Sequence, residues 1–528
     1  MTAALNARAR ALPGWAAIIA VGLVVAAPVL VILWSITDPS TEVWRELWET
    51  RLPGMIVDTV TLLVMVLAGT LVLGTGLAWL VTAHVFPGRR VIGWLLVTPL
   101  AMPAYVLGFV WLDTLSSPLG PRAVRSIWVC AAVMIFTLYP YVYLLARAAF
   151  REQSAEAVAA ARSLGYGRLG AFRRVTLPMA RPSLAAGAAL VAMEVLTDIG
   201  TVRLFNVSTI ADGVLRVWFG TGDRDAAAEL AVALIVAAVG LIALERVLRG
   251  RARFTQQGAR SRAIPERLSN GAAAGALVTT TAVLAVAVVL PVSRLVSWAA
   301  EAQRTGQNVT VEGDLATHVW STVRVASLAT IVCVGLGIVL ALSVRRRGSA
   351  GRAIGRLSTL GYAVPGPVVA IGVVIFLAAL DRQQWLPRPV LLVGSMVGLV
   401  YALTVRFVAI GVHGVGASLD KVPERAVASA RTLGARPWRV ALRIELPQAR
   451  AGVLVAAALI AADAVKELPI TLLLRPFGVN TLSVWVWQAT SESLWTQAAV
   501  PSLAMVVIGM VPVVVLLRAL ERGGELVS

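Results

Sequence analysis

Residues 161–178 have the sequence ARSLGYGRLGAFRRVTLP, and residues 430–447 have the sequence ARTLGARPWRVALRIELP. The two stretches lie 269 residues apart and align without a gap from the LG pair to the Leu-Pro pair. Both are basic and interrupt a chain that is otherwise largely apolar. A chain that carries one polar segment twice is expected to consist of two similar halves and to present the segment to a partner with a twofold arrangement.

The composition indicates a polytopic α-helical membrane protein. Of the 528 residues, 58% are hydrophobic and 14% are charged, whereas soluble globular proteins contain about 25% charged residues. Apolar runs long enough to cross a hydrocarbon core of about 30 Å recur along the chain, while a β-barrel would show short alternating segments. We expect about twelve transmembrane helices, at 14–36, 55–83, 91–112, 123–147, 183–204, 225–246, 271–297, 319–343, 354–380, 390–412, 451–474 and 496–518.

The distribution of basic residues predicts the topology. Both termini and the loops at 84–90, 146–182, 246–267, 345–356 and 406–450 carry about 33 of the 47 Lys and Arg residues, and the positive-inside rule places such segments in the cytoplasm. The same rule accounts for the net charge of +19 without a nucleic-acid partner. Six spans in each copy give both copies the same orientation, so the repeat is parallel and not inverted.

The repeat also predicts the domain boundaries. We expect a first half of six spans at residues 1–247 and a second half of six spans at residues 271–528. Residues 248–270 are polar, basic and dotted with glycine, as expected of a cytoplasmic linker between two fused halves. The repeated segments fall in the loops 150–182 and 413–450.

Each repeated segment predicts a helix–turn–helix at the cytoplasmic surface. Residues 154–164 favour a helix that stops at Gly165, and a second short stretch at 168–177 ends at Pro178. Residues 424–447 repeat this order. An amphipathic helix that only rests on lipid is the alternative, but adsorption to lipid does not require two copies to keep Gly and Leu-Pro at one spacing.

The two loops resemble the EAA loop of the membrane subunits of bacterial ABC importers. In that loop Glu-Ala-Ala is followed by Gly and then by Leu-Pro. The matching residues are Ala160, Ala161, Gly165, Leu177 and Pro178 in the first copy, and Ala430, Gly434, Leu446 and Pro447 in the second. The chain departs from the pattern at the glutamate, which is replaced by Ala159 and Ala428, and at Ser429, which replaces an alanine. Glu156 and Glu424 lie about one turn earlier and are possible substitutes.

The resemblance implies how such a chain is driven. Each loop would form a coupling helix in a groove of an ATP-binding cassette subunit, so two loops imply two such subunits, together with an extracytoplasmic substrate-binding protein. The chain lacks a P-loop, because its only lysines, Lys421 and Lys466, do not follow a GxxxxG run. We therefore expect no catalytic site, cofactor or metal site here, with ATP and Mg bound by the partners, in a multi-pass protein of the bacterial inner membrane.

The span after each repeated loop contains a group of ionisable residues. In MEVLTDIGT (193–201) and ADAVKELPIT (462–471), Glu194 aligns with Asp463 and Asp198 aligns with Glu467, and each half places its two acids on one helix face. Ionisable groups at this depth are costly and usually face a bundle interior or a pathway. We predict a translocation path or gate formed by Glu194, Asp198, Asp463, Lys466 and Glu467, with carboxylates that suit a hard cation. The alternative is an ion pair joining the halves, between Lys466 and Glu194 or Asp198.

Longer segments resemble the ferric-iron importer permeases, which are often a fused pair of halves. They include residues 193–207, 466–487 and the proline-containing 99–113 and 363–373. The resemblance spans about the whole chain and implies a type I ABC importer permease fold that moves ferric iron. Thiamine, polyamine, sulfate and phosphonate permeases share this architecture, and a stand-alone secondary transporter would also have intramembrane carboxylates, so these alternatives stay open. The prolines predict broken helices, either at a gate or in ordinary packing.

Overall fold

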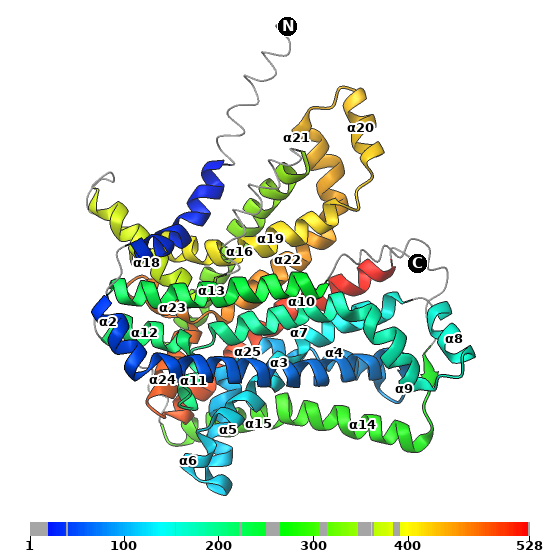
Figure 1. Ribbon diagram of the computed structural model, residues 1–528, viewed down its shortest axis with the longest axis horizontal. Helices are drawn as coiled ribbons and strands as arrows, with labels where there is room; N and C mark the ends of the chain where they lie inside the picture. The colour runs from blue at the N-terminus through cyan, green and yellow to red at the C-terminus, as the bar shows by residue number, and fades with distance from the viewer. Residues whose placement is uncertain are drawn as a thin grey trace.

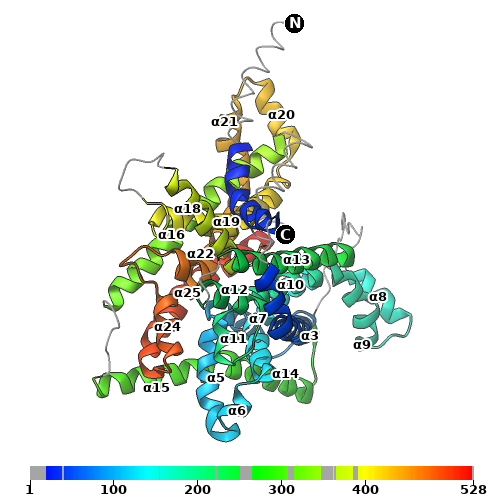
Figure 2. The ribbon, with the colours of Figure 1, turned by 60° about the vertical axis from the view of Figure 1, so that its left-hand side comes forward.

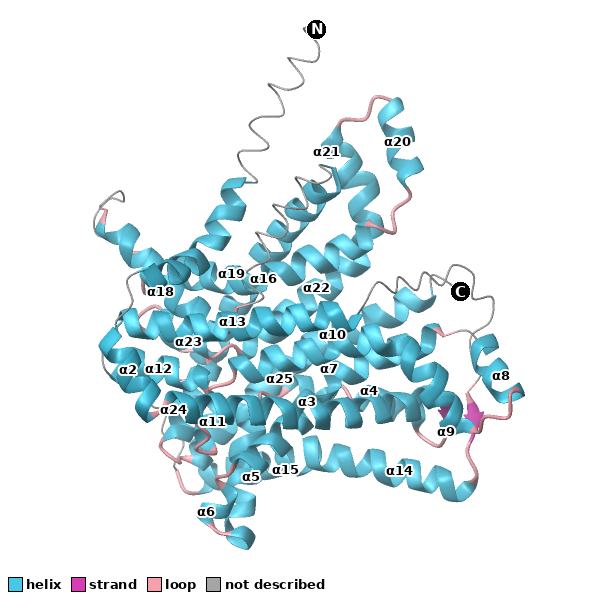
Figure 3. Ribbon diagram, viewed as in Figure 1, coloured by secondary structure: helices cyan, strands magenta, loops and turns pink. Residues whose placement is uncertain are grey.

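A computed structural model describes residues 19–37, 41–153, 155–220, 224–249, 265–306, 314–346, 361, 364–383 and 391–525. Within these ranges nearly all regular structure is helical (Figure 1, Figure 3), as predicted. The exception in the described ranges is a parallel pair of two-residue strands, β1 (His84–Val85) and β2 (Glu266–Arg267). Because β2 lies within the predicted linker 248–270, this pair attaches the end of the linker to the segment that directly follows α3 in the first half.

The described helices of the first half, in chain order, are Ile19–Trp34, η1 (Ser35–Thr37), α2 (Thr41–Thr50), α3 (Leu52–Ala83), α4 (Arg89–Leu95), η2 (Thr98–Ala101), α5 (Ala104–Leu119), α6 (Pro121–Val124), α7 (Ile127–Glu152), α8 (Ala155–Ser163), α9 (Arg168–Ala171), η3 (Phe172–Thr176), α10 (Leu177–Thr197), α11 (Gly200–Leu204), α12 (Ile210–Gly220) and α13 (Arg224–Arg249). Those of the second half are α14 (Asn270–Leu284), η4 (Ala285–Val289), α15 (Leu290–Arg304), α16 (Leu315–Arg346), α18 (Gly366–Arg382), α19 (Met396–Leu419), α20 (Glu424–Thr432), α21 (Pro437–Val440), η6 (Ala441–Glu445), α22 (Leu446–Lys466), α23 (Pro469–Leu474), α24 (Leu482–Ser491) and α25 (Trp495–Glu525). The segments η3, η4 and η6 are π-helical turns.

The described residues contain nine helices long and apolar enough to cross a membrane, or ten if one bent pair counts as one span. These ten coincide with ten of the predicted spans. The remaining two predictions, 14–36 and 354–380, lie partly outside the described residues and contain the shorter helices Ile19–Trp34 and α18.

The bent pair lies where the sequence predicts a broken helix. The axes of Arg89–Ala101 and Ala104–Leu119 differ by 93°. Met102 between them is extended, with φ −106° and ψ 121°, because the proline ring that follows disfavours helical backbone at this residue. Pro103 then precedes the first turn of α5, where its missing N–H is not needed.

The repeat is visible element by element. The starts of α8, α9, η3, α10 and α11 lie 269 residues before those of α20, α21, η6, α22 and α23. The helices α3 and α16 are both 32 residues long. In each, a threonine at the same position accepts a hydrogen bond from the start of a later helix: Thr59 Oγ1 from Ile210 N at 3.0 Å and Thr322 Oγ1 from Leu482 N at 2.8 Å. The two halves therefore share helix order and internal packing.

The first helix of each half packs against the other half. Val25, in Ile19–Trp34, forms a cluster with Leu340, Val408 and Val412 of the second half. Gly372 allows this approach, since a Cβ there would lie 2.5 Å from the Pro28 carbonyl oxygen.

The reciprocal contact is made by α14 and α15: α14 contacts α4, and α15 meets α5 (Figure 1, Figure 2). Trp111 Nε1 donates to the Val286 carbonyl at 3.2 Å, and Arg294 forms an ion pair with Asp113 at 3.0 Å. Phe109 stacks on Trp298 with ring centroids 5.9 Å apart. The two halves are thus interlocked by exchanged helices.

Candidate functional site

The repeated loops are helix–turn–helix segments that project from the body of the molecule (Figure 1, Figure 2). In the first loop Gly165, two residues after the end of α8, has a left-handed φ of 84°; in the second loop Gly434, two residues after the end of α20, has φ 80°. Gly165 N donates to the Arg162 carbonyl at 3.0 Å and Tyr166 N donates to the Ala161 carbonyl at 3.2 Å. The second loop repeats both bonds. This pair of bonds is the Schellman motif, which requires a residue that tolerates positive φ.

The predicted docking residues divide between two places. Ala159, Ala160, Ala428 and Ser429 are exposed on the short helices, while Ala161 and Ala430 turn inward. Gly165 and Gly434 lie at the turns. Leu177, Pro178, Leu446 and Pro447 lie at the starts of α10 and α22, and only Pro447 is fully exposed.

An exposed leucine, not predicted from the sequence, precedes each of these glycines. Leu164 is 75% exposed and Leu433 is 87% exposed, at equivalent positions of the repeat. Leucines this exposed on a polar loop are typical of a surface that a partner covers. Glu156 and Glu424 are exposed in the first turns of the same helices, so the acids displaced from the EAA position also face outward.

The second part of each loop does not end at the proline, which differs from the sequence prediction. A single helix runs from Arg168 to Thr197, and its counterpart runs from Pro437 to Lys466. Just before each proline the helix widens into a π-turn, η3 or η6, which accommodates the missing proline N–H without a break. Each loop is therefore connected by continuous helix to the middle of the molecule.

These two helices end at a small cavity between the halves, with a volume of about 70 Å³. All five predicted path residues line it, together with Arg406, Tyr105, Tyr141 and Thr137. Four carboxylates face two basic groups, so the formal charge of the lining is negative. Both basic groups belong to the second half, because threonines (Thr137 and Thr197) occupy the equivalent positions of the first half.

Two of the acids begin short helices. Asp198 accepts hydrogen bonds from Thr201 N and Thr201 Oγ1, both at 2.7 Å, at the start of α11. Glu467, its counterpart, accepts from Ile470 N at 3.3 Å and from Arg406 Nη1 at 3.1 Å at the start of α23. These bonds satisfy amide groups left free at a helix start inside the membrane. Arg406 was not singled out from the sequence, although an arginine inside an apolar run is the feature that would have identified it.

The remaining charged groups form a link across the two halves. Lys466 Nζ pairs with Asp463 Oδ1 at 3.0 Å and donates to the Tyr141 hydroxyl at 3.1 Å. The alternative pairing of Lys466 with Glu194 or Asp198 is not observed: in the described part of the chain its carboxylate partner is Asp463, three residues earlier. The Glu194 side chain lines the cavity without a hydrogen bond or ion pair in the described part of the chain. It is thus the acid available to a solute.

A second cavity of about 440 Å³ lies beyond α11. Gly200 lines both cavities, and a Cβ there would lie 2.9 Å from Tyr105 Cβ, so α11 packs closely against α5 at the point that separates them. Arg125, Arg203 and Arg216 line this outer cavity. Asp212 pairs with Arg203 and, at 2.5 Å, with Arg216. The described residues contain no group of three or more His, Cys, Asp or Glu side chains able to hold a metal ion.

Two interlocked helical halves, paired projecting loops and a polar cavity at the interface define a membrane transport permease. The chain belongs to the family described as binding-protein-dependent transport system inner membrane component, which it matches twice, over residues 70–244 and 334–522. The protein is therefore a multi-pass inner-membrane permease of the ABC transporter class. Membership implies that an ATPase and a binding protein act with it, and the relatives are permease subunits and not ATPases.

The chain is similar to several curated proteins with different cargoes in their names. It is 25% identical to the Fe(3+)-transport system permease protein FbpB 2 of Haemophilus influenzae, over 94% of this chain and 96% of that protein. It is 30% identical to the sulfate transport system permease protein CysT of Salmonella typhimurium, over 46% of this chain and 95% of that protein. It is 28% identical to the molybdate/tungstate transport system permease protein WtpB of Thermococcus kodakarensis, over 34% and 72% respectively.

Proposed function

We propose that this chain is the membrane permease of an ATP-driven importer for ferric iron, which an extracytoplasmic binding protein delivers. Residues 1–247 and 271–528 act as the two halves, the linker 248–270 and both termini lie in the cytoplasm, and two ATP-binding cassette subunits dock on the projecting loops. The observation that supports ferric iron as the cargo is the negative lining of the central cavity, which has four carboxylates and two basic groups. Carboxylate oxygens suit hard cations.

The ATPase subunits would drive transport mechanically, because continuous helices connect the docking loops to the central cavity. Each docking loop leads without a break into the helix that ends beside the central acids, from Arg168 to Thr197 and from Pro437 to Lys466. Closure of two ATPase subunits would bring α8 and α20 together, and a stiff helix transmits such a displacement to its far end. There α11 lies between the central cavity and the outer one, so it acts as the gate.

The full-length likeness supports the same cargo. The similarity to the Fe(3+)-transport permease extends over both halves and the whole of that protein. The sulfate and molybdate/tungstate permeases match less than half of this chain. Like this chain, the iron permease therefore contains both halves in one polypeptide.

An oxyanion is the second candidate cargo, because one observation favours it. The outer cavity is lined by Arg125, Arg203 and Arg216, with Asp212 as the acid that pairs with two of them. Guanidinium groups bind sulfate-like anions well. The similarity to permeases named for sulfate and molybdate/tungstate transport also supports this second candidate.

The test is transport by the complete complex. The full chain, its ATPase subunits and its binding protein are reconstituted in liposomes, and accumulation of radioactive ferric iron, sulfate and molybdate is measured with and without ATP. ATP-dependent accumulation of iron alone supports the proposal, whereas ATP-dependent accumulation of an oxyanion alone supports the second candidate. Accumulation that does not require ATP or the ATPase would exclude an ATP-driven importer altogether.

A further inference from the structure

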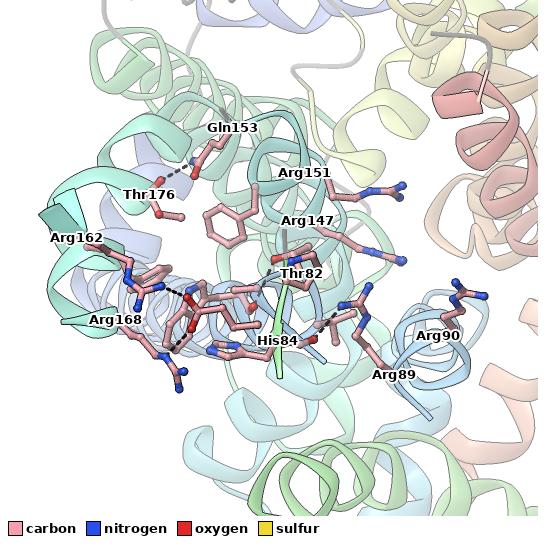
Figure 4. A pocket seen from close by; sticks show the side chains of 18 of the residues that line it. Thr82, His84, Arg89, Arg90, Arg147, Arg151, Gln153, Arg162, Arg168 and Thr176 are labelled. Atoms are coloured by element: carbon pink, nitrogen blue, oxygen red, sulfur yellow. Dashed lines mark hydrogen bonds and ion pairs between the residues drawn. The ribbon is translucent and has the colours of Figure 1, made fainter. Parts of the chain in front are cut away.

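A third cavity, independent of the transport path, lies at the base of the first loop (Figure 4). Its volume is about 480 Å³, and its walls come from the ends of α3 and α7, the start of α4, and α9 with η3. Six arginines line it, against one acid, Glu266. The lining is therefore strongly positive at the predicted cytoplasmic end of the bundle.

The arginines fall into two groups. Arg162 and Arg168 both pair with Glu266, the latter at 2.8 Å, and this contact holds the first loop to β2. The second group comprises Arg89, Arg90, Arg147 and Arg151, which have no acid partner in the described residues. Figure 4 shows Arg89, Arg147 and Arg151 on the side of the cavity away from Arg162 and Arg168.

The arginines of the second group are positioned by the backbone. Arg89 Nη1 donates to the His84 carbonyl and Arg147 Nη1 donates to the Gly93 carbonyl, both at 3.0 Å. Each such bond uses one of the five N–H groups of a guanidinium. Arg90 and Arg151 are exposed, and their side chains form no hydrogen bond or ion pair with the described residues. Most of the donors of this group are therefore free to bind an anion.

In the second half, an arginine and a glutamate occupy positions equivalent to two threonines that line this cavity. Arg345 occupies the position equivalent to Thr82, and Glu445 the position equivalent to Thr176, both of which line the cavity. Arg345 Nη2 donates to the Val422 carbonyl at 2.8 Å, Arg345 also donates to the Leu419 carbonyl, and its Nε lies 4.0 Å from the buried Glu445. In the second half an internal ion pair thus fills the space that is open in the first.

Two of the arginines also lack counterparts. The positions equivalent to Arg147 and Arg151 are Gly416 and Asp420. Among the described residues, Arg147, Arg151 and the open space therefore occur in the first half, whereas an ion pair between Arg345 and Glu445 occupies the equivalent place in the second. This is the pattern of a site, not of a charged surface that the repeat produces twice.

We propose that this cavity binds a phosphate group, with Arg90 and Arg151 as its principal anchors and Arg89 and Arg147 as supporting donors. Guanidinium groups bind phosphate through paired N–H donors. Trp79 and Trp94 also line the cavity, and tryptophan is enriched where a membrane meets water. The head group of an anionic phospholipid in the cytoplasmic leaflet is the occupant that fits this position, since basic pockets at that depth bind such head groups. Free phosphate offers the same chemistry.

The test measures binding of each source to the full chain in detergent. Native mass spectrometry compares phosphatidylglycerol with phosphatidylcholine, and a thermal-shift titration uses inorganic phosphate. Replacing Arg90 and Arg151 with glutamine should weaken the favoured ligand about thirtyfold, the expected effect of losing two arginine–phosphate attractions. The control replaces Arg181 and Arg450, which are exposed near the same membrane surface but outside the cavity, with glutamine and should bind as the unmodified chain does.

A second variant closes the cavity in the manner of the other half, by Thr82→Arg with Thr176→Glu. It removes no arginine, and it should abolish binding while the melting temperature stays at or above that of the unmodified chain. If the unmodified chain prefers phosphatidylglycerol and both variants lose this preference, the site binds lipid. If instead the unmodified chain binds inorganic phosphate and both variants lose this binding, the site binds free phosphate. Binding of neither probe, or equal binding by the closed variant, would overturn the proposal.

Discussion

Gly165 and Gly434 are the residues on which the shape of the docking loops depends most directly. Both have positive φ, and nothing lies within 4 Å of the place where a Cβ would be, so a substitution there strains the backbone without creating a clash. Gly165→Ala should cost about 1–2 kcal/mol of local free energy, which loosens the turn after α8. We expect ATP-driven transport to fall severalfold while membrane insertion is unchanged.

Gly167 is the matched control for this change. It lies two residues further on, has φ −62°, and also has open space at its Cβ position. Gly167→Ala should leave transport close to that of the unmodified protein in the same liposome assay. Equal losses for the two alanine variants would mean that the left-handed turn is not what matters.

Substitutions of Asp198 and Glu194 should have different effects, one on stability and the other on transport. The Asp198 carboxylate accepts two hydrogen bonds from Thr201, whereas the Glu194 carboxylate accepts none in the described part of the chain. Asp198→Ala should lower the unfolding free energy by about 1–2 kcal/mol, as the loss of a helix cap does. Glu194→Gln should leave the melting temperature unchanged and reduce transport at least tenfold. Glu301→Gln, on the exposed surface of α15, is the charge-matched control.

His84 gives the stability of the first loop region a pH dependence. Burial and the nearby Arg168 lower its pKa from 6.5, so folding favours the neutral ring. Because the unfolded state then binds more protons, His84 contributes stability above about pH 6.5 that is lost as the pH falls towards the folded-state pKa. We expect His84→Gln to flatten the decline in melting temperature between about pH 7 and pH 5. A decline of the same steepness in both proteins would contradict this.

At the scale of elements, the spans and loops could be predicted from the sequence because they depend on local patterns. Apolar length gives the spans, proline gives the break at 99–103, and the two LG positions give the turns. The continuity of the helix across Pro178 could not be predicted, because a π-turn that absorbs a proline has no distinct local pattern. Contacts far apart in sequence, such as Lys466 with Tyr141 or Arg162 with Glu266, were missed for the same reason.

Packing between α3 and α7 depends on one glycine of a closely spaced pair. A Cβ at Gly74 would lie 2.8 Å from Val142 Cβ and 2.9 Å from the Tyr139 carbonyl oxygen, whereas at Gly76 it would meet nothing within 4 Å. Gly74→Ala should therefore destabilise the protein by about 1–3 kcal/mol through overpacking. Gly76→Ala, on the same helix, should be neutral or stabilise it by up to about 1 kcal/mol. Melting temperatures measured in detergent check both.

At the scale of the whole molecule, the repeat explains the architecture and its exceptions explain the chemistry. The two halves share helix order and turns, which follows from their similar sequences. The cavities, by contrast, lie where the halves differ: Thr137 against Arg406 at the centre, and Thr82 against Arg345 at the base of the first loop. The sequence repeat could identify the equivalent positions, but only the packing shows which differences leave space and which fill it.

The exchange of first helices predicts that the linker is dispensable once the halves have assembled. Ile19–Trp34 packs on α16 and α19, and α14 with α15 packs on the first half, so separation would expose apolar surface on both sides. A protease site placed within residues 250–264 should therefore be cleaved without dissociation. We expect the fragments to co-elute in detergent and to support ATP-driven uptake at the level of the uncleaved protein. Separate elution of the fragments would show that the covalent link, and not the exchanged helices, holds the permease together.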